Sequence, residues 1–290
     1  MNRGILNGLG AYILWGMFPL YWKFLQQVPA LQIIGHRITW SFVLLAFVIL
    51  LKGQWKNFRA SVSSFKIFLI YFTASALLSV NWFIYVWGVN SGRIVEASLG
   101  YFINPIFCVM LGMIFFHERL RLFQWIPVIL ATAGVIYLTL QYGRVPWIAI
   151  TLAFTFGLYG LVKKLAPLDS LFGLTFETAI AFPLALAYLV FAGINGTGSF
   201  PSEDNLSNIL LIGTGVVTSV PLLLFASAAR QIPLTMIGIL QFISPTIQFL
   251  IGVLVYNEIF DRSDMIGFGL VWVALIIFWL ENYFKTKVEL

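Results

Sequence analysis

Long apolar stretches recur along the 290-residue chain, separated by short segments that contain charged residues, Gly and Pro. A helix that crosses the hydrocarbon core of a bilayer needs about 20 predominantly apolar residues. Stretches of this length predict membrane-spanning α-helices, because strands are much shorter. The pattern predicts ten such helices, at residues 4–22, 33–51, 66–89, 94–116, 123–141, 145–161, 171–192, 206–228, 234–256 and 264–283.

The composition agrees with this pattern. Apolar residues make up 60% of the chain and charged residues 10%, whereas soluble domains average about 45–50% and 25%. Ten spans would use about 200 residues, which leaves little chain for a soluble domain. The expected fold class is therefore an all-α membrane protein with ten transmembrane helices.

The distribution of Lys and Arg predicts the orientation, because positively charged loops resist translocation. With the N-terminus in the cytoplasm, four of these residues fall on the outer side, namely Lys23, Arg93, Arg144 and Arg262. Twelve fall on the inner side, namely Arg3, Lys52, Lys56, Arg59, Lys66, Arg119, Arg121, Lys163, Lys164, Arg230, Lys285 and Lys287. This predicts a multi-pass protein of the cell (inner) membrane with both termini cytoplasmic. Because orientation explains the net charge of +6, nucleic acid is not an expected partner.

The two halves of the chain are similar to each other at an offset of 140 residues. Five residues of the first half recur in the second: Phe102, Ile103, Pro105, Gly112 and Glu118 match Phe242, Ile243, Pro245, Gly252 and Glu258. A weaker match at an offset of 141 pairs Gly16 and Lys23 with Gly157 and Lys164. Since each copy contains five helices, an odd number, the second copy crosses the membrane in the opposite orientation. We expect two inverted five-helix repeats, residues 1–141 and 145–285; a duplicated scaffold without a transport role is the alternative.

Two prolines occupy equivalent positions in the two repeats. Pro105 and Pro245 lie near the middles of predicted helices, where each removes a backbone donor and frees the carbonyl of Tyr101 or Gln241. Such breaks at bilayer depth are tolerated where protein or a water-filled cavity satisfies the freed group. Proline kinks also occur in purely structural spans. Their duplication favours a functional cavity or hinge, so both prolines are assigned a coupling or gating role.

Two charged residues lie well inside predicted spans. Arg37 and Glu177 are 140 residues apart, so they are symmetry mates of opposite sign. A charge inside a span costs on the order of 2.5–3.5 kcal/mol on insertion scales, and it needs a reason to be there. Because the repeats are inverted, the two residues differ by on the order of 10 Å in depth, which predicts opposite mouths of one cavity. The hypothesis is that Arg37 attracts an anionic substrate group and that Glu177 binds a cationic group or the coupling proton; the alternative is that each holds helices together.

Further polar and aromatic residues inside the spans complete the candidate site. The substrate-binding candidates are Arg37, His36, Asn81, Trp82, Tyr85, Tyr101, Asn104, Gln241 and Ser244. Aromatic rings with a few amides suit an amphipathic organic solute better than an inorganic ion. Glu96 is expected to cap a helix, and Trp15 and Trp22 to lie in interfacial belts. With one cysteine, Cys108, and two histidines, no metal site is expected.

Several of these residues carry a resemblance to a known family. The run from Glu96 to Pro105, and Glu118 with its counterpart Glu258, resemble the drug/metabolite transporter superfamily with paired EamA domains. Within it, four short runs resemble the RarD branch, the chloramphenicol-sensitivity proteins: His36-Arg37, Asn81-Trp82, Glu177-Thr178 and Gln241 to Pro245. The resemblance covers essentially the whole chain. It implies a ten-helix inner-membrane carrier whose cavity lies between helices one to four and six to nine, with helices five and ten outside.

The resemblance does not fix a substrate, because relatives move amino acids, nucleotide sugars, quaternary amines and drugs. It also includes one departure. Small multidrug relatives couple transport to a proton at an acidic residue of the first helix, whereas residues 4–22 of this chain contain neither Asp nor Glu. That coupling site therefore does not carry over.

Together these observations predict a secondary-active transporter of a small organic metabolite or drug, working by alternating access through a central cavity. The chain contains no GxxxxGKS/T phosphate loop, HExxH, GxSxG or CxxC motif, so neither an enzyme nor a cofactor is expected. The expected partners are a small organic solute and the lipid bilayer, while proton coupling and a homodimer stay open. The alternatives are a passive channel and a facilitated carrier without ion coupling.

Overall fold

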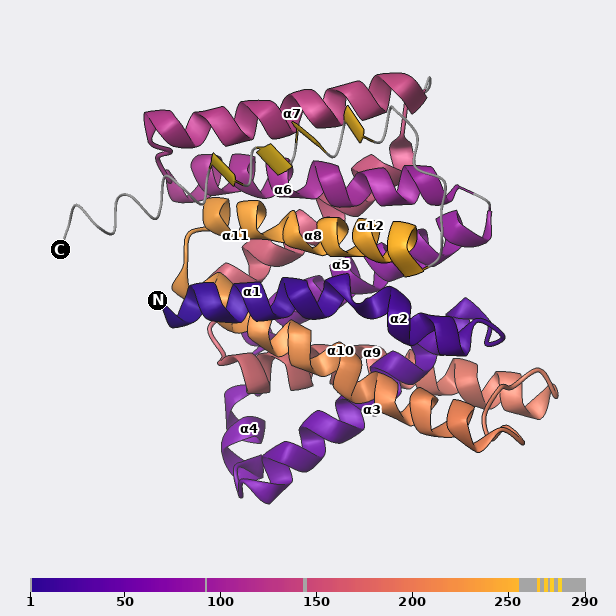
Figure 1. Cartoon of the computed structure of the whole chain (residues 1–290). Coiled ribbons are helices and arrows are strands. Elements are labelled where there is room, and N and C mark those ends of the chain that lie inside the picture. The colour runs from indigo at the N-terminus through magenta and orange to yellow at the C-terminus, as the bar shows by residue number, and fades with distance from the viewer. Residues whose placement is uncertain are drawn as a thin grey trace.

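The computed structural model describes residues 2–91, 93–142 and 145–255, with short pieces between 265 and 277. The regular secondary structure within these ranges is helical (Figure 1). The elements are α1 (Arg3–Gly16), α2 (Phe18–Trp22), the short 3₁₀ helix η1 (Lys23–Leu25), α3 (Ala30–Leu51), α4 (Trp55–Ser61), α5 (Phe65–Asn90), α6 (Ile94–Phe116), α7 (Leu122–Tyr142), α8 (Trp147–Leu165), α9 (Ser170–Ile194), α10 (Asn205–Gln231), α11 (Leu234–Gln241) and α12 (Ile243–Val255). Glu258, most of predicted helix 264–283 and the side chain of Glu96 lie outside the described part.

Seven stretches among the described residues are long and apolar enough to cross a membrane. They are Ala30–Leu51, Phe65–Gly88, Leu99–Phe116, Trp147–Leu165, Ser170–Ile194, Asn205–Gln231 and Leu234–Val255. These agree with predicted helices two to four and six to nine. The predicted first helix is divided into α1 and α2, and the predicted fifth, α7, has a shorter apolar section at Gln124–Tyr137.

The first predicted helix is interrupted at Met17, between α1 and α2. Pro19 stands in the first turn of α2 and has no N–H to donate to the carbonyl of Trp15. The side-chain amide of Gln248, on α12, donates to that carbonyl instead, at 3.1 Å. The interruption therefore stays hydrogen-bonded inside the protein, as a helix break at bilayer depth requires.

The two prolines that the sequence analysis singled out differ in their local structure. α6 continues through Pro105, whereas the equivalent helix stops at Gln241 and resumes as α12 at Ile243, with Pro245 in its first turn. Gly238 of α11 lies so close to α6 that an added Cβ would stand 2.5 Å from the carbonyl oxygen of Pro105. Tight packing against α11 therefore accompanies the uninterrupted course of α6.

Two aspartates begin helices at the edges of the apolar spans. Asp169 accepts a hydrogen bond from the Phe172 N–H at 2.9 Å and caps α9. Asp204 caps α10 by accepting from the Ser207 hydroxyl and N–H and from the Leu206 N–H. These hydrogen bonds stabilise the charged carboxylate and hold the pKa of Asp204 below its ordinary value.

The helices pack around the middle of the bundle in a regular set of pairs. α6 packs on α8 and α11, α1 on α10 and α12, α3 on α9 and α10, and α5 on α8 and α9. α7 contacts α6 and runs along the top edge of Figure 1. α7 buries Ala131 and Val135 in a small core cluster with Phe102 and Phe242.

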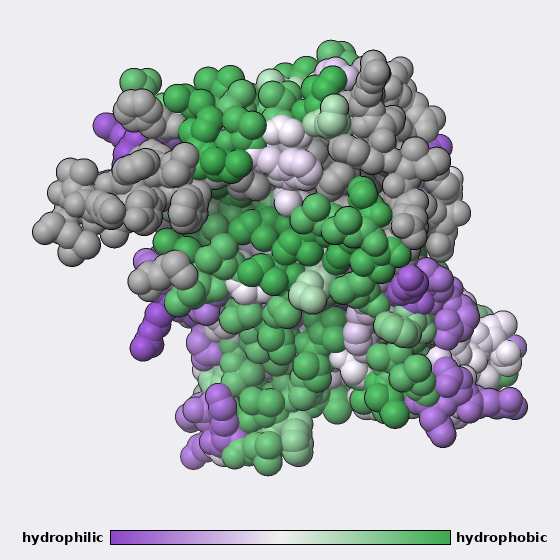
Figure 2. Space-filling model, in the orientation of Figure 1, coloured by the Kyte–Doolittle hydropathy of each residue, from purple (hydrophilic) through white to green (hydrophobic). Residues whose placement is uncertain are grey.

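The surface carries apolar side chains that a soluble protein would bury. Leu122 and Leu184 are both 79% exposed. In Figure 2, hydrophobic residues cover the middle of the visible face, and hydrophilic residues gather toward its left and right edges. Because soluble monomers rarely expose apolar patches beyond a few hundred Å², this surface is suited to lipid.

Candidate functional site

A central cavity of about 140 Å³ lies among α1, α2, α3, α5, α6, α8, α10, α11 and α12. It brings together eight of the nine substrate-binding candidates from the sequence: Arg37, Asn81, Trp82, Tyr85, Tyr101, Asn104, Gln241 and Ser244. Pro245 lines it as well. The walls therefore come from helices of both halves of the chain, whereas α9 contributes no lining residue.

Arg37 is the only charged residue among the described residues that line the central cavity. Its Nε donates a hydrogen bond to Thr218 Oγ1 of α10 at 3.0 Å. Its guanidinium carbon lies 4.2 Å from the ring centroid of Trp82 and 5.4 Å from that of Trp22. Aromatic faces attract a cation electrostatically, so these rings stabilise the charge without neutralising it.

The amide side chains of the central cavity hold its walls together. Asn81 Nδ2 donates to the Leu152 carbonyl and to Thr155 Oγ1, both at 2.9 Å. Asn104 Nδ2 donates to the Ala153 carbonyl at 3.0 Å. Both amides therefore attach their own helices, α5 and α6, to α8, with two hydrogen bonds from Asn81 and one from Asn104.

Five aromatic rings pack against one another beside the central cavity. We call this cluster the aromatic floor, and its members are Tyr12, Trp15, Phe156, Tyr159 and Phe225. Tyr12, Trp15 and Phe156 line the cavity. Phe225 lies behind them, with its ring centroid 5.5 Å from that of Phe156 and 5.9 Å from that of Tyr159. The rings come from α1, α8 and α10, so the aromatic floor joins both halves of the chain.

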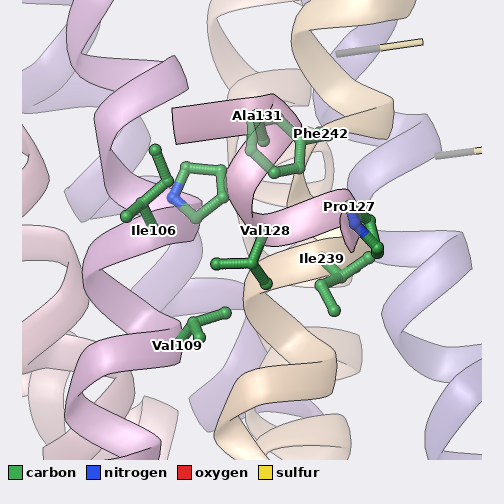
Figure 3. A pocket seen from close by; sticks show the side chains of 8 residues that line it. Ile106, Val109, Pro127, Val128, Ala131, Ile239 and Phe242 are labelled. Atoms are coloured by element: carbon green, nitrogen blue, oxygen red, sulfur yellow. The ribbon is translucent and has the colours of Figure 1, made fainter. Parts of the chain in front are cut away.

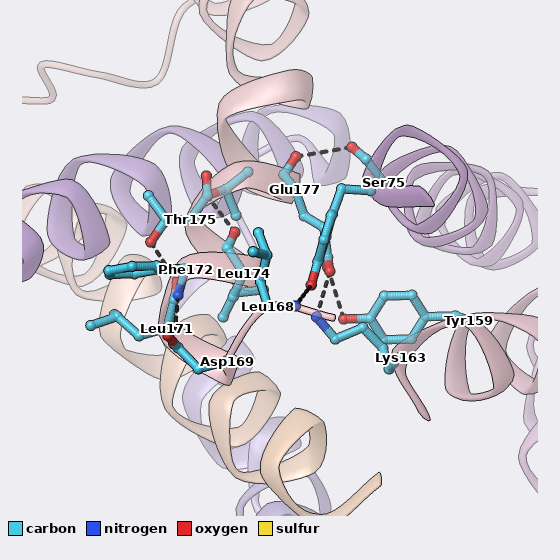
Figure 4. A network of polar contacts seen from close by, with 12 residues as sticks. Ser75, Tyr159, Lys163, Leu168, Asp169, Leu171, Phe172, Leu174, Thr175 and Glu177 are labelled. Atoms are coloured by element: carbon cyan, nitrogen blue, oxygen red, sulfur yellow. Dashed lines mark hydrogen bonds and ion pairs between the residues drawn. The ribbon is translucent and has the colours of Figure 1, made fainter. Parts of the chain in front are cut away.

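Glu177 does not line the central cavity. It contacts Tyr159, a member of the aromatic floor, and lies in a network of polar contacts (Figure 4). Its carboxylate forms an ion pair with Lys163 of α8. Tyr159 donates to its Oε2 at 3.1 Å, and Ser75 of α5 donates to its backbone carbonyl at 3.0 Å. The side chains of Lys163 and Glu177 are 3% and 2% exposed. Both carboxylate oxygens of Glu177 are thus partnered, and Glu177 is not among the residues that line the cavity with Arg37. Its coupling or gating role stays a prediction.

The structure also corrects the position expected for Lys163. The sequence analysis counted it among the inner loop charges, but it is buried inside α8. A buried carboxylate needs a nearby cation, and Lys163 lies one helical turn after Tyr159, so both reach Glu177. One signal could have identified Lys163 as a buried residue. It lies on the same helix face as Tyr159, an aromatic residue of the core.

His36 and Pro105 lie away from the central cavity. His36 Nδ1 accepts a hydrogen bond from the Trp40 indole at 3.2 Å, and its ring meets Phe200 edge-on at 5.3 Å. Pro105 borders a small apolar pocket between α6, α7 and α11, shown in Figure 3. Side chains such as Val128 and Ile239 line this pocket, so it offers no polar group to a ligand.

Several residues of the site were not predicted from the sequence. Trp15 and Trp22, which were expected in interfacial belts, line the central cavity, and Thr218 is the hydrogen-bond partner of Arg37. One signal was present: Trp15 and Phe156 are 141 residues apart, the offset of the weaker internal match. Thr218 has no such signal, because its role depends on where α10 crosses α3.

Glu118 connects the end of α6 to the beginning of α11. Its two carboxylate oxygens accept hydrogen bonds from the N–H groups of Leu234 and Thr235, both at 2.8 Å. Lys164 Nζ lies 3.6 Å from the same carboxylate and donates to the Ile232 carbonyl. A carboxylate at a helix N-terminus is stabilised by the unpaired N–H groups and the helix dipole. Glu118 therefore acts as a helix cap supplied by another helix.

The chain is similar to a family of membrane transporters. The model of the EamA-like transporter family matches residues 2–140 and 145–280. Protein RarD of Escherichia coli is 41% identical over 288 residues, 99% of this chain and 97% of that protein. Protein RarD of Streptomyces exfoliatus is 40% identical over 95% of this chain and 88% of that protein. The uncharacterized transporter YojE of Bacillus subtilis is 47% identical over 96% and 93%.

A solved crystal structure shares the fold. It covers 95% of this chain and 97% of its own, with a TM-score of 0.71 and 15% sequence identity. At this identity the likeness shows the fold alone.

Proposed function

The chain belongs to the EamA-like transporter family and its RarD branch, and from this premise we propose that it is a secondary-active transporter of a small organic solute. The family and the apolar helices make it a multi-pass membrane transporter. One observation carries the finer proposal: helices from both halves surround one cavity, and its described lining residues include one charged side chain. We infer that the aromatic floor closes this cavity at its inner end. A cavity that is closed at one end is what alternating access requires.

The proposed architecture is ten spans in two inverted repeats, residues 1–141 and 145–285. The family model matches each half separately, at 2–140 and 145–280. In these repeats α1 is equivalent to α8, α5 to α10, and α6 to α11 and α12. Contacts between equivalent helices recur: α1 packs on α10, and α8 packs on α5. Likewise α6 packs on α8, and α12 packs on α1. These repeated contacts support a two-fold relation between the halves.

The proposed orientation places both termini in the cytoplasm of a cell with this protein in its inner membrane. The connection from α2 to α3 then lies outside, and Trp22 and Arg37 lie near it. The aromatic floor and the Glu177–Lys163 pair lie toward the inner side. In this proposal the structure is the outward-facing state of the cycle, with the inner end closed.

We assign Glu177 a gating role in this cycle. Its pair with Lys163 connects α9 to α8, and Tyr159 connects the pair to the aromatic floor. Opening the inner end separates these helices, and water replaces the lost contacts. A proton delivered to Glu177 would remove its attraction for Lys163, which is how a proton gradient would drive the opening.

Counterflow in proteoliposomes tests whether the protein is a carrier. Solutes are first selected by their effect on the thermal unfolding midpoint of the purified protein, using acids, amines, sugars and drugs. Vesicles loaded with a selected solute then receive a trace of the same solute in labelled form. A carrier accumulates the label transiently and saturates, whereas a passive channel gives flux proportional to the gradient. Flux without saturation would reject the proposal.

A further inference from the structure

We propose that the central cavity binds an organic monoanion, a carboxylate on an aromatic or otherwise apolar body, with its charged end on Arg37. This inference rests on the proposed transport function, because it names the substrate class of the same cavity. It is carried by the guanidinium of the half-buried Arg37, which has no carboxylate partner among the described residues and lies over aromatic rings.

The first step concerns the hydrogen-bonding capacity of Arg37. A guanidinium has five N–H donors, and in the described part of the chain only the Nε–H makes a hydrogen bond, to Thr218. The other contacts of the guanidinium are with the rings of Trp82, Trp22 and Phe18, at 4.2, 5.4 and 5.9 Å. The planar fork formed by the two terminal nitrogens matches the geometry of a carboxylate. Arg37 therefore retains the donors that a carboxylate would accept from.

The second step compares Arg37 with its symmetry mate. Glu177 contacts Lys163 and Tyr159, while Arg37 contacts Trp22 and Phe18, the residues 141 positions before those two. The charge of Glu177 is neutralised by Lys163. In the central cavity, Trp22 stands beside Arg37 at the position equivalent to Lys163, so an aromatic ring replaces the residue that would carry the opposite charge. A bound anion would complete the pair that the protein itself completes on the other side.

The third step is the net charge of the cavity. Its described lining residues include no Asp or Glu, and Glu177 is separated from it by the aromatic floor and occupied by Lys163. The one charged side chain that a cationic amine would meet in the described lining is Arg37, a like charge. A dianion would leave one charge unpaired in a mostly apolar site, which is costly. A single negative charge makes the occupied cavity neutral.

The fourth step concerns the body of the solute. Asn81 Nδ2 makes two hydrogen bonds to α8 and Asn104 Nδ2 makes one, and Gln248 donates to the Trp15 carbonyl. Aromatic faces line much of the wall, and such faces favour an aromatic or apolar body over a sugar or another polyol. The volume of about 140 Å³ is also below the 300–1,000 Å³ typical of sites for drug-sized molecules. The site suits a small solute with one aromatic ring.

The test uses three probes that share a benzyl group and differ in charge: phenylacetate, phenylacetamide and phenethylamine. Binding to the purified full-length protein is measured by the shift in the thermal unfolding midpoint and by isothermal titration calorimetry. We expect saturable binding of phenylacetate and at least tenfold weaker binding of the amide and the amine. This comparison on the wild-type protein needs no variant to fold.

Two arginine variants test whether Arg37 is the charge that binds phenylacetate. Arg37→Gln is expected to weaken phenylacetate binding at least tenfold and to leave amide binding unchanged. Arg93→Gln is the control, because Arg93 also lies over a tryptophan, Trp87, at 5.5 Å, but does not line the central cavity. It should bind phenylacetate as the wild type does.

The outcomes separate this inference from the proposed function. Equal binding of the amide or the amine, no binding of phenylacetate, or full phenylacetate binding by Arg37→Gln would overturn the monoanion assignment and leave the carrier proposal standing. Conversely, Arg37-dependent binding without counterflow of phenylacetate or any other bound solute would reject the carrier proposal and keep the binding assignment.

Discussion

At the residue scale, the partnership of Glu177 with Lys163 determines how substitutions on either side act. Both side chains are almost fully buried. Removing one partner from a buried ion pair leaves an uncompensated charge and costs about 3–5 kcal/mol, whereas replacing both is often close to neutral. We expect Lys163→Met to lower the free energy of unfolding by about 3–5 kcal/mol, and Lys163→Met with Glu177→Gln to recover most of that loss. Denaturant unfolding of the purified protein in detergent measures both.

Lys164→Met provides the neighbouring control. Lys164 lies 3.6 Å from the Glu118 carboxylate and is 17% exposed, so its ion pair is better hydrated. The variant removes this pair and the hydrogen bond from Lys164 to the Ile232 carbonyl, so we expect a loss of about 1–2 kcal/mol, smaller than that of Lys163→Met. Glu177→Gln alone completes the comparison. If the double variant Lys163→Met with Glu177→Gln were destabilised by the sum of the losses of the two single variants, the Lys163–Glu177 pair would not be the source of the effect.

The same scale shows which site residues a sequence can identify. Arg37, Asn81 and Gln241 could be predicted because polar groups are rare inside spans and need a reason to be there. Thr218 and Lys163 could not. Thr218 is 181 residues from Arg37, and Lys163 stands beside Lys164, where two adjacent lysines indicate a helix end. Their roles arise from helix crossings that no local pattern encodes.

At the element scale, the crossing of α6 and α11 depends on a glycine. A Cβ at Gly238 would lie 2.5 Å from the Pro105 carbonyl oxygen and 3.1 Å from Cys108 Cβ. Backbone atoms cannot move aside as a flexible side chain does, so the two helices would have to separate. We expect Gly238→Ala to lower the free energy of unfolding by about 1–3 kcal/mol, as overpacking of a close contact does. The unfolding midpoint in detergent measures this change.

Gly193 supplies the matched control on α9. A Cβ there meets no atom within 4 Å, and replacing a helical glycine by alanine favours the helix by about 1 kcal/mol. Gly193→Ala should therefore equal or exceed the wild type in stability. Equal losses at Gly193 and Gly238 would show that close packing at the crossing is not responsible.

The elements themselves followed from the sequence more reliably than their interruptions. Helices such as α3 and α9 could be predicted because a bilayer fixes the length of an apolar span. The division at Met17 could not, because it depends on Gln248 reaching the Trp15 carbonyl from a distant helix. At Pro105 a break could be expected from the sequence, but α6 continues through it. α6 is packed closely between α8 and α11, and a proline alone does not interrupt such a helix.

At the scale of the whole molecule, alternating access couples the two ends of the central cavity. If the Glu177–Lys163 pair holds the inner end closed, weakening it shifts the population away from the outward-facing state. Tyr85 lines the cavity and can report on that population. With Cys108→Ser as background, we expect Tyr85→Cys to react with a membrane-impermeant maleimide applied from outside, and to react more slowly once Glu177→Gln is added. Asn195→Cys, in the exposed connection after α9, should react at the same rate in both backgrounds. An unchanged or faster reaction of Tyr85→Cys would contradict a gate at Glu177, because a conformational equilibrium cannot open one end without closing the other.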